Sequence, residues 1–332
     1  MKKTIILITL LLTFLIGTST TTFAATDEHI EVFLGTYRGW YYANQGHTGL
    51  TLNVYVNENG EYEASFNFYS VPENPSVPSG EYICSVQYNA TDNSYYVEGL
   101  KWIKRPSNYV FVDLDGILEN NIYSGNVITS SKTFKFELVK QIGDNATSNW
   151  ADDTVNTAII ESYVPLELQS NYQSKITRAD FSRLTIAAIS LKTGKSIEAF
   201  MADKNTDIIE NPFDDTDDIF VTYANSLGIL SGYGNRKFGP NDPITREQAA
   251  CMLMSLAGVL DVDITQAQII PFNDRSTFSS WALKGINFTS SFKDSNTSAP
   301  IMSGYNNQFK PKDGYTREQA IITIYKLIKA IN

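Results

Sequence analysis

The first third of the chain alternates between polar and apolar residues. The pattern is clearest in residues 51–57, and it returns in residues 61–69 after the turn-forming pair Asn59-Gly60. Alternation of this kind predicts half-buried strands joined by a tight hairpin. Further strand-like runs cover residues 32–42, 81–88, 95–103, 109–118, 122–129 and 132–140. About eight short strands with short connections favour antiparallel neighbours, so residues 30–141 are expected to form a β-barrel or a β-sandwich.

The pattern changes after a polar segment at residues 142–149, which we interpret as a linker. Apolar residues now recur at spacings of three and four, which is typical of amphipathic helices. Helices are expected in residues 150–163, 177–191, 219–227, 245–260, 279–288 and 316–331. The sequence therefore predicts a multidomain protein, with an all-β N-terminal domain and an all-α C-terminal half.

Four short sequence elements recur in the helical half, in a constant order. An Ile/Tyr-Thr-Arg element stands at residues 176–180, 244–248 and 315–319. The other three elements occur twice each: a Gly-Tyr element at 228–233 and 300–305, Phe-x-Pro at 238–240 and 309–311, and Phe-x-Asp at 213–215 and 272–274. A constant order of this kind indicates tandem repeats.

These elements resemble the S-layer homology (SLH) repeat, with three copies at residues 150–203, 204–265 and 266–332. The resemblance implies a pseudo-threefold helical domain that holds an exported protein non-covalently on a Gram-positive cell wall. The ligand it implies is a secondary cell-wall polysaccharide, often one that carries pyruvate ketals. The binding residues expected from this resemblance are Thr177, Arg178, Asp180, Gly232, Thr245, Arg246, Glu247, Trp281, Gly304, Thr316, Arg317 and Glu318. The first copy lacks the Gly-Tyr and Phe-x-Pro elements, so it departs most from the family pattern.

The threonine of each Thr-Arg element precedes a helical pattern. Thr245 and Thr316 have Gln three residues later, which is the spacing of a capping box, and Thr177 has Asp at that place. Helix capping alone would explain Thr and Gln, but not an Arg at the first helical position, where a cation opposes the helix dipole. Free backbone N–H groups beside a guanidinium would suit a carboxylate or phosphate. The sequence leaves a structural and an anion-binding role open.

The glycines and tryptophans of the repeats also have alternative interpretations. Gly232 and Gly304 could occupy turns with positive φ, or they could let a sugar approach the backbone. Trp281, and Trp150 at the matching place in the first copy, could be core residues or sugar-stacking faces.

Charge and composition exclude several functions. The chain of 332 residues has a net charge of −10, so no general attraction for nucleic acid or anionic membranes is expected. Two His and two Cys are too few for a zinc cluster or a disulfide scaffold. Both His precede residue 50, which argues against a Ser-His-Asp triad in the rest of the chain. We expect no cofactor and no enzymatic activity.

The N-terminal segment is typical of an export signal. Lys2 and Lys3 precede a short apolar run, and Ala24 ends a stretch of small residues, so residues 1–24 are expected to be a secretory signal peptide. No second long apolar run follows, and no membrane span is expected after cleavage. We therefore expect a secreted protein of the Gram-positive cell wall, cell surface or S-layer.

The β-domain holds 20 of the 41 aromatic residues. Either they form a Tyr-rich core, or some of them form a surface that binds a sugar or an apolar ligand, and the sequence does not name that ligand. A wall-tethered enzyme that cleaves polysaccharide is one alternative function, and a structural S-layer subunit is another. The enzyme would need two partnered carboxylates in this domain, where the candidates are Glu61, Glu63, Glu98, Asp113 and Asp115.

Overall fold

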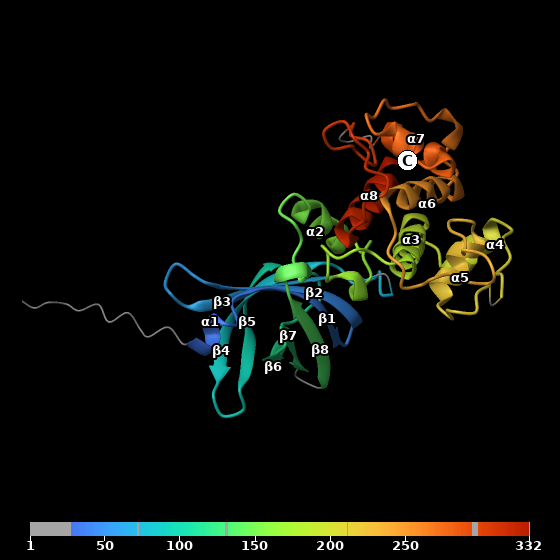
Figure 1. Cartoon of the computed structure of the whole chain (residues 1–332). Helices are drawn as coiled ribbons and strands as arrows, with labels where there is room; N and C mark the ends of the chain where they lie inside the picture. The colour runs from blue at the N-terminus through green and yellow to red at the C-terminus, as the bar shows by residue number, and fades with distance from the viewer. Residues whose placement is uncertain (1–27, 72, 130–131, 211, 294–297, 332) are drawn as a thin grey trace, which may run out of the picture.

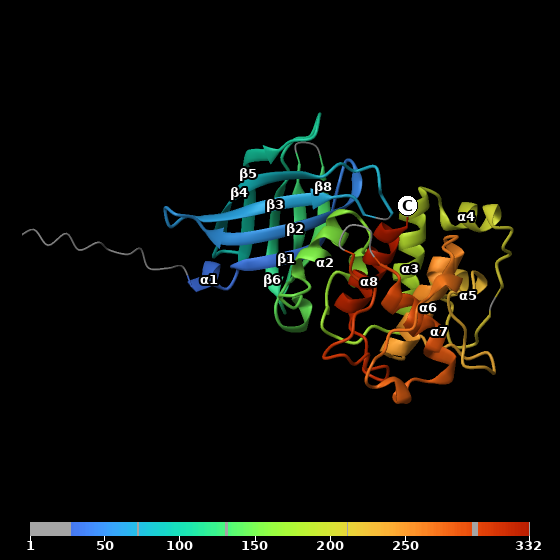
Figure 2. The same ribbon diagram turned by 90° about the horizontal axis from the view of Figure 1, so that it is seen from above.

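The computed structural model describes residues 28–71, 73–129, 132–210, 212–293 and 298–331. The expected signal peptide at residues 1–24 lies outside these ranges. Figures 1 and 2 show a β-barrel made by the first part of the chain beside a helical region made by the second. Within the described ranges, none of the helices has the length and the apolar character needed to cross a bilayer.

Eight antiparallel strands form a closed barrel, in which each strand pairs with the next and β8 pairs with β1. The expected β-domain is therefore a barrel and not a sandwich. Its hairpin at Asn59-Gly60 joins β2 to β3, with Gly60 at a φ of 80°. The strands are β1 Gly35–Ala43, β2 Gly46–Val56, β3 Tyr62–Tyr69, β4 Gly80–Asn89, β5 Ser94–Lys104, β6 Asp113–Glu119, β7 Ile122–Ile128 and β8 Thr133–Lys140.

Aromatic side chains fill the barrel. Tyr37, Tyr82 and Tyr123 are buried, and each hydroxyl donates a hydrogen bond of 2.9–3.0 Å to a backbone oxygen. The buried ring of Phe33, which follows the short helix α1 (Glu28–Glu31), stacks on Tyr95 with centroids 4.1 Å apart. Much of the aromatic content of this domain is therefore a Tyr-rich core whose hydroxyls bond to protein.

The helical region has one continuous hydrophobic core, to which α3, α5, α6, α7 and α8 all contribute buried side chains such as Leu184, Val221, Leu253, Ile286 and Ile324. The α-helices are α2 Asp152–Ile160, α3 Arg178–Thr193, α4 Ile197–Asp203, α5 Ile219–Ser226, α6 Arg246–Val259, α7 Leu283–Ser291 and α8 Arg317–Ala330. Short 3-10 turns lie between them: η1 Gly143–Asn145, η2 Leu166–Leu168, η3 Ile264–Gln266, η4 Arg275–Thr277 and η5 Ser280–Ala282.

The barrel and the helical region contact each other directly. The Tyr69 side chain at the end of β3 is buried in the helical core, and its hydroxyl donates to Gln169 at 2.9 Å. The hydroxyls of Ser70 and Ser162 lie 2.5 Å apart. The polar segment at 142–149 is also fixed, because Ser148 hydrogen bonds through its backbone and its hydroxyl to a carboxylate of α8. The two parts are therefore held together by side-chain contacts and not only by the connecting chain.

Candidate functional site

The three Thr-Arg elements begin α3, α6 and α8, as expected. Thr177, Thr245 and Thr316 are the N-caps, and each side-chain oxygen accepts from the backbone N–H three residues later. The capping boxes expected at Thr245 and Thr316 are both complete. Figure 1 shows these helices converging in the helical region.

The residues before these threonines form a closed cycle of backbone hydrogen bonds. Ile176 donates to Tyr315 at 2.9 Å, Tyr315 donates to Ile244 at 3.1 Å, and Ile244 donates to Ile176 at 3.2 Å. Segments separated by about 70 residues along the chain therefore meet at one point, which we call the Thr-Arg ring. The ring brings the beginnings of the three helices together, with the same backbone hydrogen bond between one segment and the next.

The first backbone N–H groups of these helices are occupied. Arg178 N–H donates to Asp242 O, Arg246 N–H to Asp313 O and Arg317 N–H to Ser174 O, all at 2.9–3.0 Å. The next N–H group in each helix also donates to a carbonyl oxygen of the same loop: Ala179 to Pro240, Glu247 to Pro311, and Glu318 to Tyr172. The expectation of free N–H groups for an anion is therefore wrong, because neighbouring loops already satisfy them.

The Arg178 side chain is buried and has a structural role. It is 4% exposed, and its Nε and Nη2 groups donate to the backbone oxygens of Phe238 and Ser231 at 2.8 and 2.5 Å. The guanidinium also lies over the rings of Tyr233 and Phe238, at 4.6 and 4.5 Å from their centroids. Burial lowers the pKa of this guanidinium, and the nearby Tyr233 and Asp242 act in the opposite direction. Arg178 thus holds the Gly-Tyr element at 228–233 and the Phe-x-Pro element at 238–240.

Arg246 repeats this arrangement in a more open setting. It is half-buried, and it donates to the backbone oxygens of Phe309 and Ser303, both at 3.0 Å. Arg317 departs from the pattern, because its Nη1 donates to Ser170 O at 2.6 Å and its Nη2 pairs with Asp180 at 2.8 Å. The structure therefore brings together two of the expected binding residues, Arg317 and Asp180, as an ion pair.

Glu247 and Glu318 are buried carboxylates, each 3% exposed. Glu247 accepts from the backbone N–H and hydroxyl of Ser279 at 3.1 and 3.0 Å, and it pairs with Lys312. Glu318 accepts from the same two groups of Ser148 at 2.8 and 2.9 Å. Each carboxylate therefore fixes the segment that precedes another helix, α7 for Glu247 and α2 for Glu318.

Gly232 and Gly304 do not have positive φ, so the interpretation as left-handed turn residues is wrong. A Cβ at Gly232 would lie 2.5 Å from the Phe213 ring, and one at Gly304 would lie 2.6 Å from the Phe272 ring. Both glycines are required because the phenyl ring of the Phe-x-Asp element packs on them.

Four aromatic side chains that belong to, or lie close in sequence to, the recurring elements are exposed. Trp281 and Trp150 are 57% and 63% exposed, so they are not core residues. Each stands two residues after the serine held by Glu247 or Glu318. Tyr233 and Tyr305 of the Gly-Tyr elements are exposed as well. The two tyrosines were not among the expected binding residues, although their recurrence after Gly was a usable signal.

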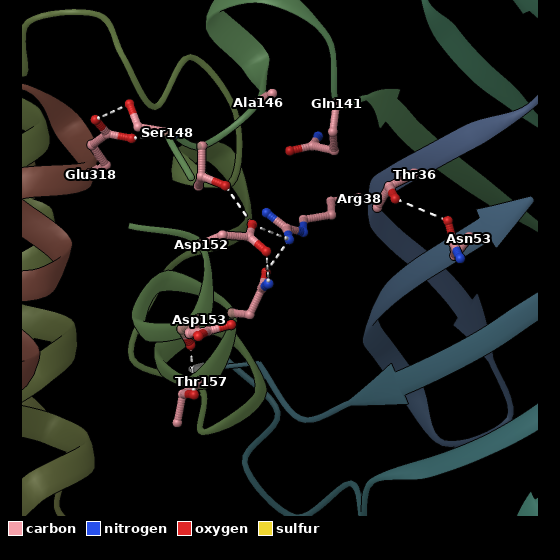
Figure 3. Close-up of polar contacts among 12 residues, drawn as sticks. Thr36, Arg38, Asn53, Gln141, Ala146, Ser148, Asp152, Asp153, Thr157 and Glu318 are labelled. Carbon is pink, nitrogen blue, oxygen red and sulfur yellow. Dashed lines mark hydrogen bonds and ion pairs between the residues drawn. The ribbon is translucent and has the colours of Figure 1, made fainter. Parts of the chain in front are cut away.

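Two further surfaces lie on or beside the barrel. A cleft of about 890 Å³ lies between the outer face of β1–β5 and α2, and Figure 3 shows polar side chains that line it. None of the twelve expected polysaccharide-binding residues is among its described lining residues. On β1 and β2, Trp40, Tyr42 and His47 form an outward aromatic cluster with ring centroids 4.6–5.5 Å apart.

The five carboxylates considered for catalysis are all at outward positions of the barrel. Glu63 accepts from Tyr55 and Asn57, and Asp113 accepts from Tyr96 and from the backbone N–H of Gly99. None of the five lines the cleft beside α2. Among the described residues, no group of three or more His, Cys, Asp or Glu could hold a metal ion.

The fold and the Thr-Arg ring define a two-part protein: a closed eight-stranded barrel attached to a helical region built from recurring, capped Thr-Arg helices. Residues 212–250, which run from the Phe-x-Asp element into α6, match the family model of the S-layer homology domain. The chain therefore contains an S-layer homology domain.

Two curated relatives match longer stretches. One is an amylopullulanase of Thermoanaerobacterium thermosulfurigenes, 26% identical over 211 residues, which are 61% of this chain and 10% of that protein. The other is an endoglucanase of Bacillus sp. (strain KSM-635), 28% identical over 156 residues, which are 46% of this chain and 15% of that protein. The chain thus matches only a small part of each relative. Together with the domain match, the comparisons indicate association with the cell surface.

Proposed function

We propose that the protein is an exported, non-enzymatic surface protein of a Gram-positive bacterium. Its helical region holds it non-covalently on the cell wall by binding a secondary cell-wall polysaccharide, and it displays the barrel outward. In this proposal the region is a pseudo-threefold unit of three SLH copies. The cyclic hydrogen bonding of the Thr-Arg ring supports three copies, because each Thr-Arg segment has the same relation to the next.

The observation that carries the proposal is the pairing of an exposed tryptophan with a capped Thr-Arg helix. At the α6 seam, defined by Arg246, Glu247, Ser279, Trp281 and Lys312, the exposed Trp281 lies two residues after Ser279, and Glu247 binds both Ser279 and Lys312. A sugar stacks on such a ring through its apolar face, while a cation attracts an acidic substituent such as a pyruvate ketal. The α6 seam is therefore our principal polysaccharide site.

The other two seams are less suited to an anionic polymer. The α8 seam is formed by Arg317, Glu318, Ser148 and Trp150. Its Trp150 is exposed, but Arg317 is already paired with Asp180 at 2.8 Å. The α3 seam is the beginning of α3 around Arg178, Ala179 and Tyr233. There Ala179 stands where the other helices have Glu, and Arg178 is buried under Tyr233. We propose that the α8 seam contributes weakly and that the α3 seam has a structural role.

The test is sedimentation of the full-length protein with purified cell-wall sacculi. Intact sacculi should retain the protein, and sacculi stripped of secondary polymer should release it. Trp281→Ala should weaken retention at least tenfold, and Trp150→Ala should weaken it less. Ile269→Ala removes an equally exposed apolar side chain of the same region and is the control. Equal retention by stripped sacculi would refute the anchoring function.

The alternative of a wall-tethered polysaccharide-cleaving enzyme draws on the names of the two relatives. Those names belong to proteins of which this chain matches 10% and 15%. We propose no catalytic role, because three of the five candidate carboxylates accept hydrogen bonds from neighbouring groups and none lines the cleft. A structural S-layer subunit is the third alternative, and ordered arrays formed by the pure protein would favour it.

A further inference from the structure

One row of polar side chains crosses the outer face of the barrel inside the cleft beside α2. Arg38 pairs in register with Thr51, Thr51 with Asn67, Asn67 with Glu81, and Glu81 with Lys104. All five residues line the cleft. Neighbouring strands are about 4.8 Å apart, so five strands give a polar row of about 19 Å. The cleft therefore has the length of an extended ligand with several polar units.

Two buried polar atoms of the lining residues lack a hydrogen-bond partner among the described residues. They are the Nε–H donor of Arg38 and the Oε1 acceptor of Gln141. Figure 3 shows both side chains reaching from the barrel toward the segment that leads into α2. A buried polar group without a partner is unfavourable, and a ligand that supplies one is favoured. A hydroxyl group accepts from one such atom and donates to the other.

The charges of the cleft argue against an acidic ligand. Arg38 and Lys104 are opposed by Glu81, Asp152 and Asp153, so the charged lining residues sum to −1. Arg38 is also engaged by α2, through a hydrogen bond to Asn156 and an ion pair with Asp152 at 3.8 Å. The remaining polar groups are amides, carboxylates and hydroxyls, which suit neutral hydroxyl groups.

We propose that this cleft is a second carbohydrate site, which binds a neutral, hydroxyl-rich oligosaccharide along the row from Arg38 to Lys104. It is distinct from the α6 seam in position and in charge preference. The oligosaccharide accepts from Arg38 Nε, donates to Gln141 Oε1, and bonds to Thr51, Asn67 and Glu81 along the row. Ile160, which is exposed at the edge of the cleft, offers an apolar contact to a sugar ring.

The experiment is isothermal titration of the full-length protein with cellohexaose, maltohexaose and chitohexaose, and with hexagalacturonate as the acidic probe. We expect at least one neutral probe to bind, and hexagalacturonate to bind at least tenfold more weakly. Asn67→Ala and Gln141→Leu should each raise the Kd of the neutral probe at least fivefold. Asn67 is an outward position of a strand, so its substitution is compatible with folding, and circular dichroism checks this.

Two controls separate this site from its alternatives. Asn126→Ala removes the same side chain from an outward position of β7, away from the cleft, and should leave the Kd unchanged. Trp281→Ala should also leave the Kd of the neutral probe unchanged, while Asn67→Ala should leave retention on sacculi unchanged. The two carbohydrate proposals can therefore be tested independently. Absence of binding by all neutral probes, equal binding of the acidic probe, or an Asn67→Ala protein with unchanged Kd would overturn the proposal.

Discussion

The three arginines of the Thr-Arg ring occupy the same sequence position but have different surroundings. Arg178 is buried, Arg246 is half-buried, and Arg317 has a carboxylate partner. In each case the guanidinium donates to a backbone oxygen of an adjacent loop. An Arg at the first helical position is therefore explained by loop contacts, which outweigh an unfavourable dipole term of roughly 0.3–1 kcal/mol. Sequence reasoning could not weigh these contacts, because the loops lie about 60 or more residues away.

Arg178→Ala should destabilise the helical region strongly. It removes two charge-assisted hydrogen bonds, each worth about 1.5–3 kcal/mol, and leaves the oxygens of Phe238 and Ser231 without that donor. We expect a loss of roughly 3 kcal/mol in the free energy of unfolding, measured by urea denaturation. Lys195→Ala breaks an exposed ion pair with Asp203 and should cost less than about 1 kcal/mol. Similar losses for the two variants would contradict the structural role of Arg178.

Asp215 should make stability depend on pH. The backbone N–H groups of Phe238 and Gly239 donate to its carboxylate at 2.9 and 3.0 Å, and they lower its pKa. A carboxyl group whose pKa is lower in the folded protein stabilises the fold at pH values above its unfolded pKa of about 3.9. This contribution is lost as the pH falls through the folded pKa. Asp215→Asn should therefore flatten the fall in the urea midpoint between about pH 5 and 2. Asp92→Asn, in an exposed turn of the barrel, controls for the loss of one charge. If the urea midpoint falls equally steeply with pH in Asp215→Asn and in the wild type, Asp215 does not make this contribution.

At the scale of elements, the local sequence pattern predicts the strands and most of the helices. It does not predict that the sheet closes into a barrel. Alternation and the Asn59-Gly60 turn located the strands, but the pairing of β8 with β1 distinguishes a barrel from a sandwich and joins segments about 100 residues apart. The helix α4 (Ile197–Asp203) was missed, because seven residues are too few to show a period. The capping boxes were predictable because each lies within four residues. The serine partners of Glu247 and Glu318 were not predictable, because they lie 32 and 170 residues away in the sequence.

Glu318→Ala should loosen the segment that leads into α2 from α8. The carboxylate accepts two hydrogen bonds from Ser148, 170 residues away in the sequence, and it is buried. Losing both charge-assisted bonds should cost roughly 3 kcal/mol, while Ser148→Ala, which removes only the hydroxyl, should cost about half as much. Glu161→Ala breaks a more exposed pair with Lys329 and should cost less than about 1 kcal/mol. Urea denaturation of the three variants measures this order, and a Glu318→Ala loss no larger than that of Glu161→Ala would contradict the role of Glu318.

At the scale of the whole molecule, the barrel has its own hydrophobic core, and the Tyr69 side chain at its edge packs in the core of the helical region. The buried residues of the barrel form their own cluster, yet Tyr69 belongs to the cluster of the helical region. This arrangement holds the barrel, and the cleft beside α2, in a fixed orientation on the helical region. Contacts of this kind couple the unfolding of two domains when they are strong enough.

Tyr69→Ala should uncouple the two parts. The wild-type protein should unfold in one calorimetric transition, because Tyr69 is buried in the helical core and bonds to Gln169. Removing the ring should cost about 3–5 kcal/mol and separate the transition into two, since the barrel keeps its own aromatic core. Tyr69→Phe loses only the hydroxyl, so it should lower stability by about 1 kcal/mol and keep one transition. Tyr42→Ala, at an exposed outward position of β1, should also keep one transition. If the wild type already shows two transitions that Tyr69→Ala leaves unmoved, the barrel is not coupled to the helical region through this side chain.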